Sequence, residues 1–283
     1  MSTVGTPLAG TVASGLAAAL CWGCSDFSGG LASRRANPAS VVVATSAAGL
    51  TLLLVLALIW HQPLPRPVDV LWAGLAGLTG SLGLVAFYTA LSSTKMGLAA
   101  PVSALLTAAL PVTFGVFTAG WPAAAQLGGF GLAGIALVLI AGPERGTGSA
   151  KALGLAILGG ASGGCFFILI SRIGPASIFW SLAVSRLVSL PPVLLWIRRQ
   201  RVPLLPGRAT AGLAVLAGIL DAAGSVFFVA AALSGPLDVA AVLSSLYPAA
   251  TVALAALALR ERVRRPQAIG ILLVLLAVTL ISA

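Results

Sequence analysis

Leu237–Ala283 reads LDVAAVLSSLYPAATVALAALALRERVRRPQAIGILLVLLAVTLISA, two apolar segments joined by an arginine-rich hinge. A shift of 141 residues lays this stretch without a gap on Met96–Gly142. The identities include Ala99 with Ala240, Ser103 with Ser244, Gln126 with Gln267 and Gly129 with Gly270. Upstream, the same shift pairs Gly77 with Gly218, Gly83 with Gly224 and Phe87 with Phe228. Because 141 is half of the 283 residues, to within one residue, the sequence predicts one unit used twice.

The composition excludes a soluble domain. Hydrophobic residues make up 59% of the chain and charged residues 8%, and the mean hydropathy is +1.09. A water-soluble surface cannot be built from so few polar side chains. The apolar runs are long enough to cross the hydrocarbon core as helices, which takes about 20 residues each. They do not alternate with polar residues, which argues against a membrane β-barrel.

Ten such runs predict an all-α polytopic membrane protein with five spans in each copy. Because five is odd, the second copy enters the membrane from the opposite side, which gives two inverted five-helix repeats, residues 1–142 and 143–283. The expected spans are Leu8–Leu31, Val41–Trp60, Val70–Leu91, Gly97–Thr118, Ala123–Ala141, Leu153–Ile173, Ile178–Ile197, Ala209–Leu233, Leu237–Leu259 and Gln267–Ala283.

The charges of the loops carry a topology signal. The chain has a formal net charge of +10. Thirteen Lys and Arg residues follow the odd-numbered spans, whereas only Arg66 and Arg172 follow the even-numbered ones. The positive-inside rule then places the odd loops in the cytoplasm and both termini outside. We interpret the basic residues as contacts of phospholipid headgroups, not of nucleic acid.

Several motifs resemble the EamA branch of the drug/metabolite transporter superfamily. They are Trp22-Gly23 in the first span, Leu243-Ser244-Ser245-Leu246-Tyr247-Pro248 in the ninth, Arg260-Glu261-Arg262 and Gln267-x-x-Gly270. The resemblance implies a ten-helix carrier that moves small metabolites, mostly outward, and both termini inside, in conflict with the loop charges. The first copy departs from the pattern, since it has Leu106-Thr107 where the second has Tyr247-Pro248 and Gly120-Trp121 where a Glu-Arg hinge is expected.

Three ionisable residues fall inside expected spans: Asp26, Arg186 and Asp221. A charge at the bilayer centre costs about 2.5–3.5 kcal/mol on insertion scales, so each needs a partner or a watery cavity. Arg186 and Asp221 have similar depths in the seventh and eighth spans. Two interpretations remain open for them: a structural ion pair, or a site for the charged ends of an amino-acid-like solute.

Asp26 lies one helical turn after Trp22, among small residues that leave room for a cavity. A carboxyl group in such a cavity can hold a proton and release it to water on one side, as proton exchange requires. The alternative is that Asp26 only caps the end of the first span. Both interpretations are kept.

Other candidate lining residues for a solute cavity are Trp22, Tyr88, Phe87, Phe227, Phe228, Ser244 and Tyr247. Pro248 frees a backbone carbonyl near Ser244 because proline has no N–H to donate. Pro101 and Pro111 are expected to interrupt the fourth span in the same way. The glycines of the third span, Gly74 to Gly83 at every third position, predict close helix packing.

No nucleotide-binding loop, no Ser/His/Asp set and no metal-ligand cluster is present in the sequence. Cys21, Cys24 and Cys165 are interpreted as small packing residues. We therefore expect no enzyme activity and no cofactor or metal.

These features favour a secondary transporter of the bacterial inner (plasma) membrane that exports a small amino-acid-like or amphipathic solute by alternating access, in exchange for a proton through Asp26 or Asp221. The partners expected are the solute, protons and the lipid bilayer. A multidrug or organic-cation exporter is the alternative within transport, and a membrane scaffold or lipid-handling protein is the alternative outside it. The substrate, the direction of flux, the coupling ion and the choice between monomer and homodimer stay open.

Overall fold

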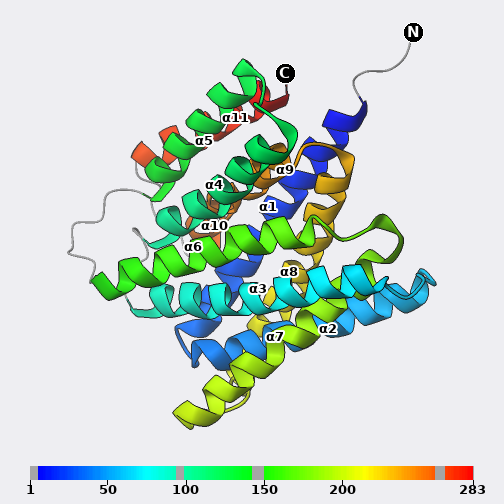
Figure 1. Ribbon diagram of the computed structural model, residues 1–283. Coiled ribbons are helices and arrows are strands. Elements are labelled where there is room, and N and C mark those ends of the chain that lie inside the picture. Colours follow the sequence, from blue (N-terminus) through cyan, green and yellow to red (C-terminus); the bar gives the residue numbers. More distant parts are fainter. Residues whose placement is uncertain (1–5, 94–98, 142–149, 259–264, 283) are drawn as a thin grey trace.

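The computed structural model describes residues 6–93, 99–141, 150–258 and 265–282, and its regular structure there is helical throughout (Figure 1). The first half contains α1 (Thr6–Ser33), α2 (Pro38–Ile59), α3 (Pro67–Ser93), α4 (Ala99–Ala119) and α5 (Ala124–Ala141). The second half contains α6 (Ala150–Ile170), η1 (Pro175–Ser177), α7 (Ile178–Gln200), α8 (Arg208–Ser234), α9 (Leu237–Ser244), α10 (Tyr247–Ala258) and α11 (Arg265–Ser282).

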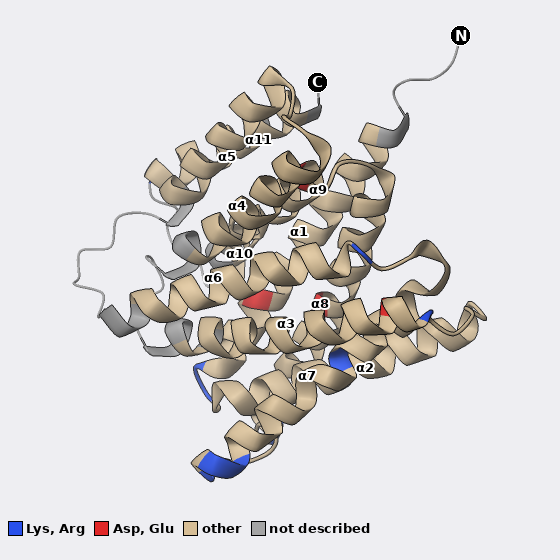
Figure 2. Cartoon of the chain, viewed as in Figure 1, with Lys and Arg blue, Asp and Glu red and all other residues tan. Residues whose placement is uncertain are grey.

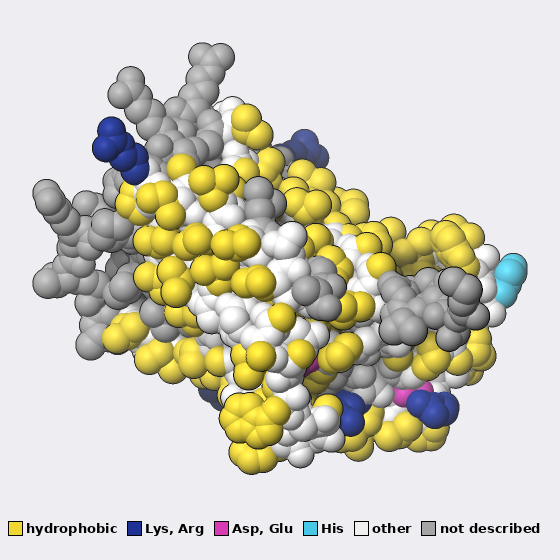
Figure 3. Space-filling view, turned by 90° about the horizontal axis from the view of Figure 1, so that it is seen from above, with side chains coloured by type: hydrophobic (Ala, Val, Ile, Leu, Met, Phe, Trp, Pro, Cys, Tyr) yellow, Lys and Arg dark blue, Asp and Glu magenta, His cyan; other side chains and the backbone are white. Residues whose placement is uncertain are grey.

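Six of the described helices have the length and hydropathy to cross a membrane, namely α1, α2, α3, α6, α7 and α8. The remaining apolar helices, α4, α5, α9 with α10, and α11, are shorter within the described residues. Uncharged residues, tan in Figure 2, cover most of every helix. Hydrophobic side chains occupy much of the face seen in Figure 3. Such a surface suits lipid, as the composition predicts.

The expected ninth span, Leu237–Leu259, is not one helix. It breaks between Ser244 and Tyr247, so that α9 ends and α10 begins around buried residues. Pro248 lies in the first turn of α10, where its missing N–H leaves no helical bond unmade. In a continuous helix Pro248 would leave the Ser244 carbonyl without a donor, and Ser244 is the residue at which α9 ends.

Pro111 behaves differently. The expectation that it interrupts the fourth span is wrong, because α4 runs without a break from Ala99 to Ala119 with Pro111 inside it. A proline within a membrane helix is tolerated when the surroundings satisfy the freed carbonyl. Proline alone thus did not decide which of the two helices would break.

The main helix pairs follow the sequence repeat. α1 packs chiefly on α8, and α3 packs on α6. The 141-residue shift carries the α1–α8 pair onto the α6–α3 pair, and it likewise carries α2–α8 onto α7–α3, which also pack together. α5 and α11 lie side by side at one edge of the bundle, away from α2 and α7 (Figure 1).

Two related glycines allow the closest approaches. A Cβ on Gly77 of α3 would collide with the backbone of Ser185 on α7, and one on Gly218 of α8 would collide with the backbone of Thr45 on α2. Gly77 and Gly218 are paired by the 141-residue shift. Close backbone packing of this kind is common where small residues line membrane helices.

The connections after α2 and after α6 are tied together. The Arg66 guanidinium donates to Asp69 at 2.8 Å and 3.0 Å, and the Asp69 carboxylate accepts from the Gly174 backbone N–H at 3.0 Å. The Gln62 side chain accepts from the Phe179 N–H at 2.9 Å. At the opposite end of the bundle, the Ser40 hydroxyl donates to the Pro203 carbonyl.

Candidate functional site

Arg186 and Asp221 form an ion pair between α7 and α8. The distance between Arg186 Nη1 and Asp221 Oδ2 is 2.6 Å. Arg186 Nη2 donates to Ser225 Oγ at 2.8 Å and lies 3.4 Å from the Asp221 carbonyl oxygen. The Ser225 hydroxyl in turn donates to the same carbonyl at 2.9 Å. Both ends of the guanidinium are therefore engaged within the protein.

Trp22 of α1 is fixed beside this pair. Its indole Nε1 donates to the Asp221 carbonyl at 3.2 Å, and its ring stacks on Phe167 of α6 with centroids 5.0 Å apart. Phe228 of α8 packs against both rings, 4.3 Å from Phe167 and 5.8 Å from Trp22. The three aromatic side chains join α1, α6 and α8 into one packed layer.

A cavity of about 130 Å³ lies on one side of this layer. Its walls come from both halves of the chain. They are Trp22, Asp26, Val42, Ser46, Ala76, Gly77, Gly80, Ser81, Gly83, Leu84, Phe87, Thr107, Gly163, Phe166, Phe167, Ser185, Arg186, Ser189, Asp221 and Tyr247. The volume far exceeds the roughly 10–15 Å³ that one water needs but is smaller than the roughly 300–1,000 Å³ of drug-sized pockets. A small solute fits its size.

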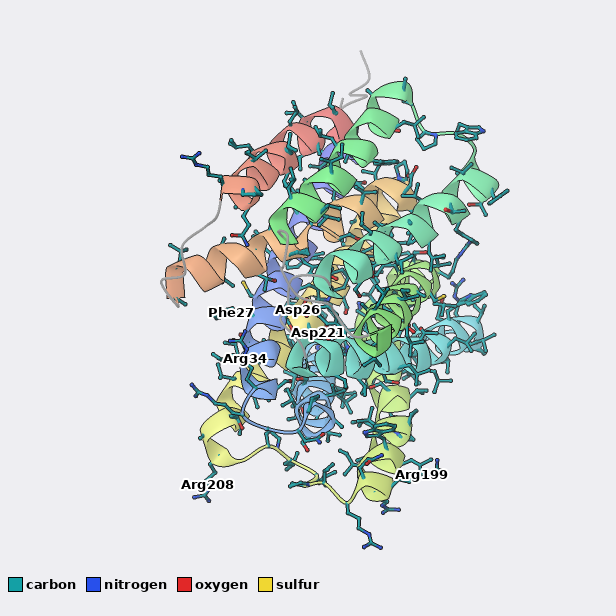
Figure 4. The ribbon with its side chains drawn as sticks, turned by 90° about the vertical axis from the view of Figure 1, so that its left-hand side faces the viewer. Asp26, Phe27, Arg34, Arg199, Arg208 and Asp221 are labelled. Atoms are coloured by element: carbon teal, nitrogen blue, oxygen red, sulfur yellow. The ribbon has the colours of Figure 1, made fainter. Side chains whose placement is uncertain are left out.

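Asp26 differs from Asp221 although both line the cavity. The labelled side chains lie near one another at the centre of the bundle in Figure 4, on α1 and α8. No hydrogen bond or ion pair to the Asp26 carboxylate is found among the residues that the structure describes. The half-buried Asp26 carboxylate is thus left to the cavity, whereas Asp221 is held by Arg186.

Of the other residues predicted for the site, some line the cavity and some do not. Tyr247, at the start of α10, lines the cavity with Asp26. Phe228 is fully buried behind Trp22 and Phe167 and does not line it. Ser244 lies at the end of α9, where its hydroxyl donates to the Gly15 carbonyl at 3.4 Å, also away from the lining. The Tyr88 side chain lies outside the described residues.

Sequence reasoning missed Phe167 and Gly80, which are the repeat counterparts of Asp26 and Asp221. The 141-residue shift carries Asp26 onto Phe167 and Gly80 onto Asp221, and all four line the cavity. Trp22 and Gly163 form a third such pair, but most lining residues have counterparts that do not line the cavity, as Phe87 and Phe228 show. Phe166, Ser46 and Ser189 were missed as well, and the latter two share a 3.3 Å hydrogen bond across α2 and α7.

The site offers charge and aromatic surface but no metal-ligand set. Among the described residues, no group of three or more His, Cys, Asp or Glu side chains could hold a metal ion. The Cys21, Cys24 and Cys165 thiols are free. What the cavity can do chemically is bind a small charged or amphipathic molecule and exchange a proton at a carboxylate.

The chain matches one known protein family over nearly its whole length. The model of the EamA-like transporter family matches residues 10–142 and again residues 147–283, so it covers nearly the whole chain in two copies. The chain belongs to the EamA-like transporter family. It is accordingly a membrane protein of the drug/metabolite transporter superfamily, and its family is one of transporters and not of enzymes.

One solved structure has a fold similar to that of this EamA-family protein. That structure, described only as "Crystal structure of protein", aligns with a TM-score of 0.70 and 20% sequence identity over 96% of both chains. It is one of 28 solved chains that match. No curated protein sequence was found to match. At 20% identity the likeness concerns the fold alone.

Proposed function

We propose that this EamA-family protein is a secondary exporter of a small amphipathic solute, amino-acid-like compounds included, and that it works by alternating access in exchange for protons. The observation that carries the proposal is the cavity between the two halves, which both halves line and which holds one carboxylate without a partner among the described residues. Binding sites of inverted-repeat carriers lie at this place.

In this proposal Asp26 binds the proton and the solute in turn. A proton and a bound cationic group compete for this carboxylate, because either one neutralises its charge. Asp221 is less suited to the role because Arg186 already compensates its charge at 2.6 Å. Alternating access then opens the site with Asp26 first to one side of the bacterial inner membrane and then to the other.

The same observation argues against a membrane scaffold without a solute cycle. In a scaffold we expect each buried charge to be paired permanently. An unpaired charge in the membrane raises the free energy of the folded protein, and a scaffold has no transport step that needs one. The pair of Arg186 and Asp221 alone would fit a scaffold. Asp26 does not fit it.

The test is solute-driven proton release from the purified protein in weakly buffered solution near neutral pH. Amino acids, nucleosides and organic cations are screened with the wild type, with Asp26→Asn and with Asp221→Asn. Asp238→Asn serves as a matched control, since Asp238 is a buried carboxylate that packs against Gly115 and does not line the cavity. We expect a solute class to release protons from the wild type and from Asp238→Asn but not from Asp26→Asn.

Export itself is measured with reconstituted vesicles that carry a pH gradient. Solute uptake against its own gradient, in the direction opposite to proton flow, supports the proposal. If no solute releases protons and none crosses the vesicle membrane faster than in protein-free vesicles, the proposed function is wrong.

A further inference from the structure

The charged side chains that line the cavity do not cancel. Its described lining contains three charged side chains, Asp26, Arg186 and Asp221. The ion pair of Arg186 and Asp221 is neutral overall. The net charge of the described lining is therefore that of one carboxylate, Asp26, and it is −1 when that group is ionised.

Arg186 is poorly placed to receive a solute carboxylate. Its Nη1 is held by Asp221 at 2.6 Å and its Nη2 by Ser225 at 2.8 Å. A solute carboxylate would have to displace Asp221, which would leave that carboxylate buried without its partner. Breaking such a pair costs more than a new, equivalent pair returns, because the displaced charge stays out of water.

Asp26 is placed to receive a positive charge. Five aromatic side chains share the cavity with it: Trp22, Phe87, Phe166, Phe167 and Tyr247. Aromatic faces attract an ammonium group, and the attraction grows when the site is shielded from water. A carboxylate among aromatic rings therefore selects an organic cation, and the apolar walls accept a short hydrocarbon part.

We infer that the solute is a small organic cation with one positive charge, and that it replaces one proton on Asp26 in a one-for-one, electroneutral exchange. This inference rests on the proposed function and narrows its substrate class. When the cation approaches, the Asp26 carboxylic acid gives its proton to water and the carboxylate pairs with the cation. No other bond changes, and the site is neutral before and after. A zwitterion would bring a second charge with no open partner.

The groups that face Asp26 are compatible with this exchange. Asp221 on α8, Arg186 on α7 and Tyr247 on α10 are the titratable or charged side chains that share the described lining with it. The lining parts of α2, α3, α4 and α6 are uncharged. Asp238 on α9 lies against Gly115 of α4, outside the lining, and Arg265 lies at the start of α11. Asp26 is thus the carboxylate of the described lining that no counterion holds, and the proposed exchange takes place there.

The binding test uses matched solutes that share one side chain and differ chiefly in charge. Alaninamide, alanine and N-acetylalanine give a cation, a zwitterion and an anion, and the leucine and phenylalanine series repeat the comparison with larger apolar parts. Choline and glycine betaine form a fourth set with permanent charge. We expect the cation of at least one set to release protons and to bind about tenfold to a hundredfold tighter than its zwitterion, as for one hydrogen bond to a charged group. Asp26→Asn abolishes the release, whereas Asp238→Asn keeps it.

The transport test separates the pH gradient from the membrane potential. Vesicles with the reconstituted protein receive either a pH gradient or a potassium diffusion potential set with valinomycin, and the cation that released protons is measured against protein-free vesicles. We expect protein-dependent flux to follow the pH gradient and to stay unchanged when the potential is imposed or reversed.

Three results would overturn the inference and leave the proposed function standing: proton release by zwitterions as strong as by their amides, proton release by anionic or neutral solutes alone, or flux driven by the potential. Absence of proton release by every solute would instead contradict the proposed function itself.

Discussion

Arg186 and Asp221 lie 35 residues apart on helices that pack mainly on other neighbours, yet their charged groups approach to 2.6 Å. α7 packs on α2 and α3, and α8 packs on α1 and α2, so the pair reaches across a junction of several helices. This single contact leaves Asp26 as the carboxylate of the cavity without a counterion among the described residues.

The ion pair is expected to matter for stability mainly when it is broken on one side. Asp221→Leu leaves the Arg186 charge buried without a partner, and we expect it to lower the free energy of unfolding by about 3–5 kcal/mol. The double variant Arg186→Met/Asp221→Leu should recover most of that loss, because two apolar side chains carry no desolvation cost. Denaturation in detergent measures both, and a double variant as unstable as Asp221→Leu would contradict this account.

The close approaches at Gly77 and Gly218 predict a pair of sensitive positions. Gly77→Ala and Gly218→Ala each force a methyl group into a neighbouring backbone, and we expect a loss of about 1–3 kcal/mol for each. Gly74→Ala is the matched control on α3, since its Cβ would lie 3.9 Å from Val188 in ordinary contact. Equal thermal stability of Gly74→Ala and Gly77→Ala would show that α3 and α7 are less tightly packed.

The aromatic layer predicts a contrast between two adjacent residues. Phe228 is 0% exposed between Trp22 and Phe167, whereas Phe227 is 40% exposed. Phe228→Ala should cost about 3–5 kcal/mol through the cavity it leaves, and Phe227→Ala should cost much less. Thermal unfolding of the two variants side by side decides the point. Similar losses of stability in the two variants would mean that Phe228 is not packed more tightly than Phe227.

The tie between the connections after α2 and α6 is expected to depend on Asp69 more than on Arg66. The Arg66 side chain is 68% exposed and that of Asp69 is 2% exposed. Arg66→Ala removes an ion pair whose cation lies largely in solvent while the Asp69 carboxylate keeps the Gly174 N–H, and we expect a cost of about 1 kcal/mol. Asp69→Ala also leaves the Gly174 N–H without its acceptor, and we expect it to cost about 1–3 kcal/mol more.

Hydrogen exchange at the Gly174 amide checks the origin of that cost. In Asp69→Ala the amide should exchange faster, because its hydrogen bond is lost, whereas in Arg66→Ala it should stay protected. Equal exchange rates at Gly174 in both variants would show that the amide does not depend on the Asp69 carboxylate.

The broken helix shows where local sequence stops being informative. Pro248 and Pro111 both lie within apolar segments, and both lack an N–H. Only the first lies at a break, since α9 ends at Ser244 and α4 continues through Pro111. The cost of a freed carbonyl depends on what neighbouring helices offer to it, and that information belongs to the packing.

The sequence by itself determined the membrane class, the two-copy organisation and the resemblance to the EamA family, because hydropathy and spacing are properties of the chain alone. It also determined which charges had to be accounted for, since Asp26, Arg186 and Asp221 are costly in a bilayer wherever their helices lie. The repeat relates Phe167 to Asp26 and Gly80 to Asp221, but it does not tell which lining residues have a counterpart in the lining.

Only the tertiary structure decided which charges are partners. Periodicity assigns a residue to a face of its own helix, but the distance between faces of different helices depends on how closely the backbones pack. That packing brought Arg186 to Asp221, placed Phe228 behind Trp22 and left the Asp26 carboxylate facing the cavity.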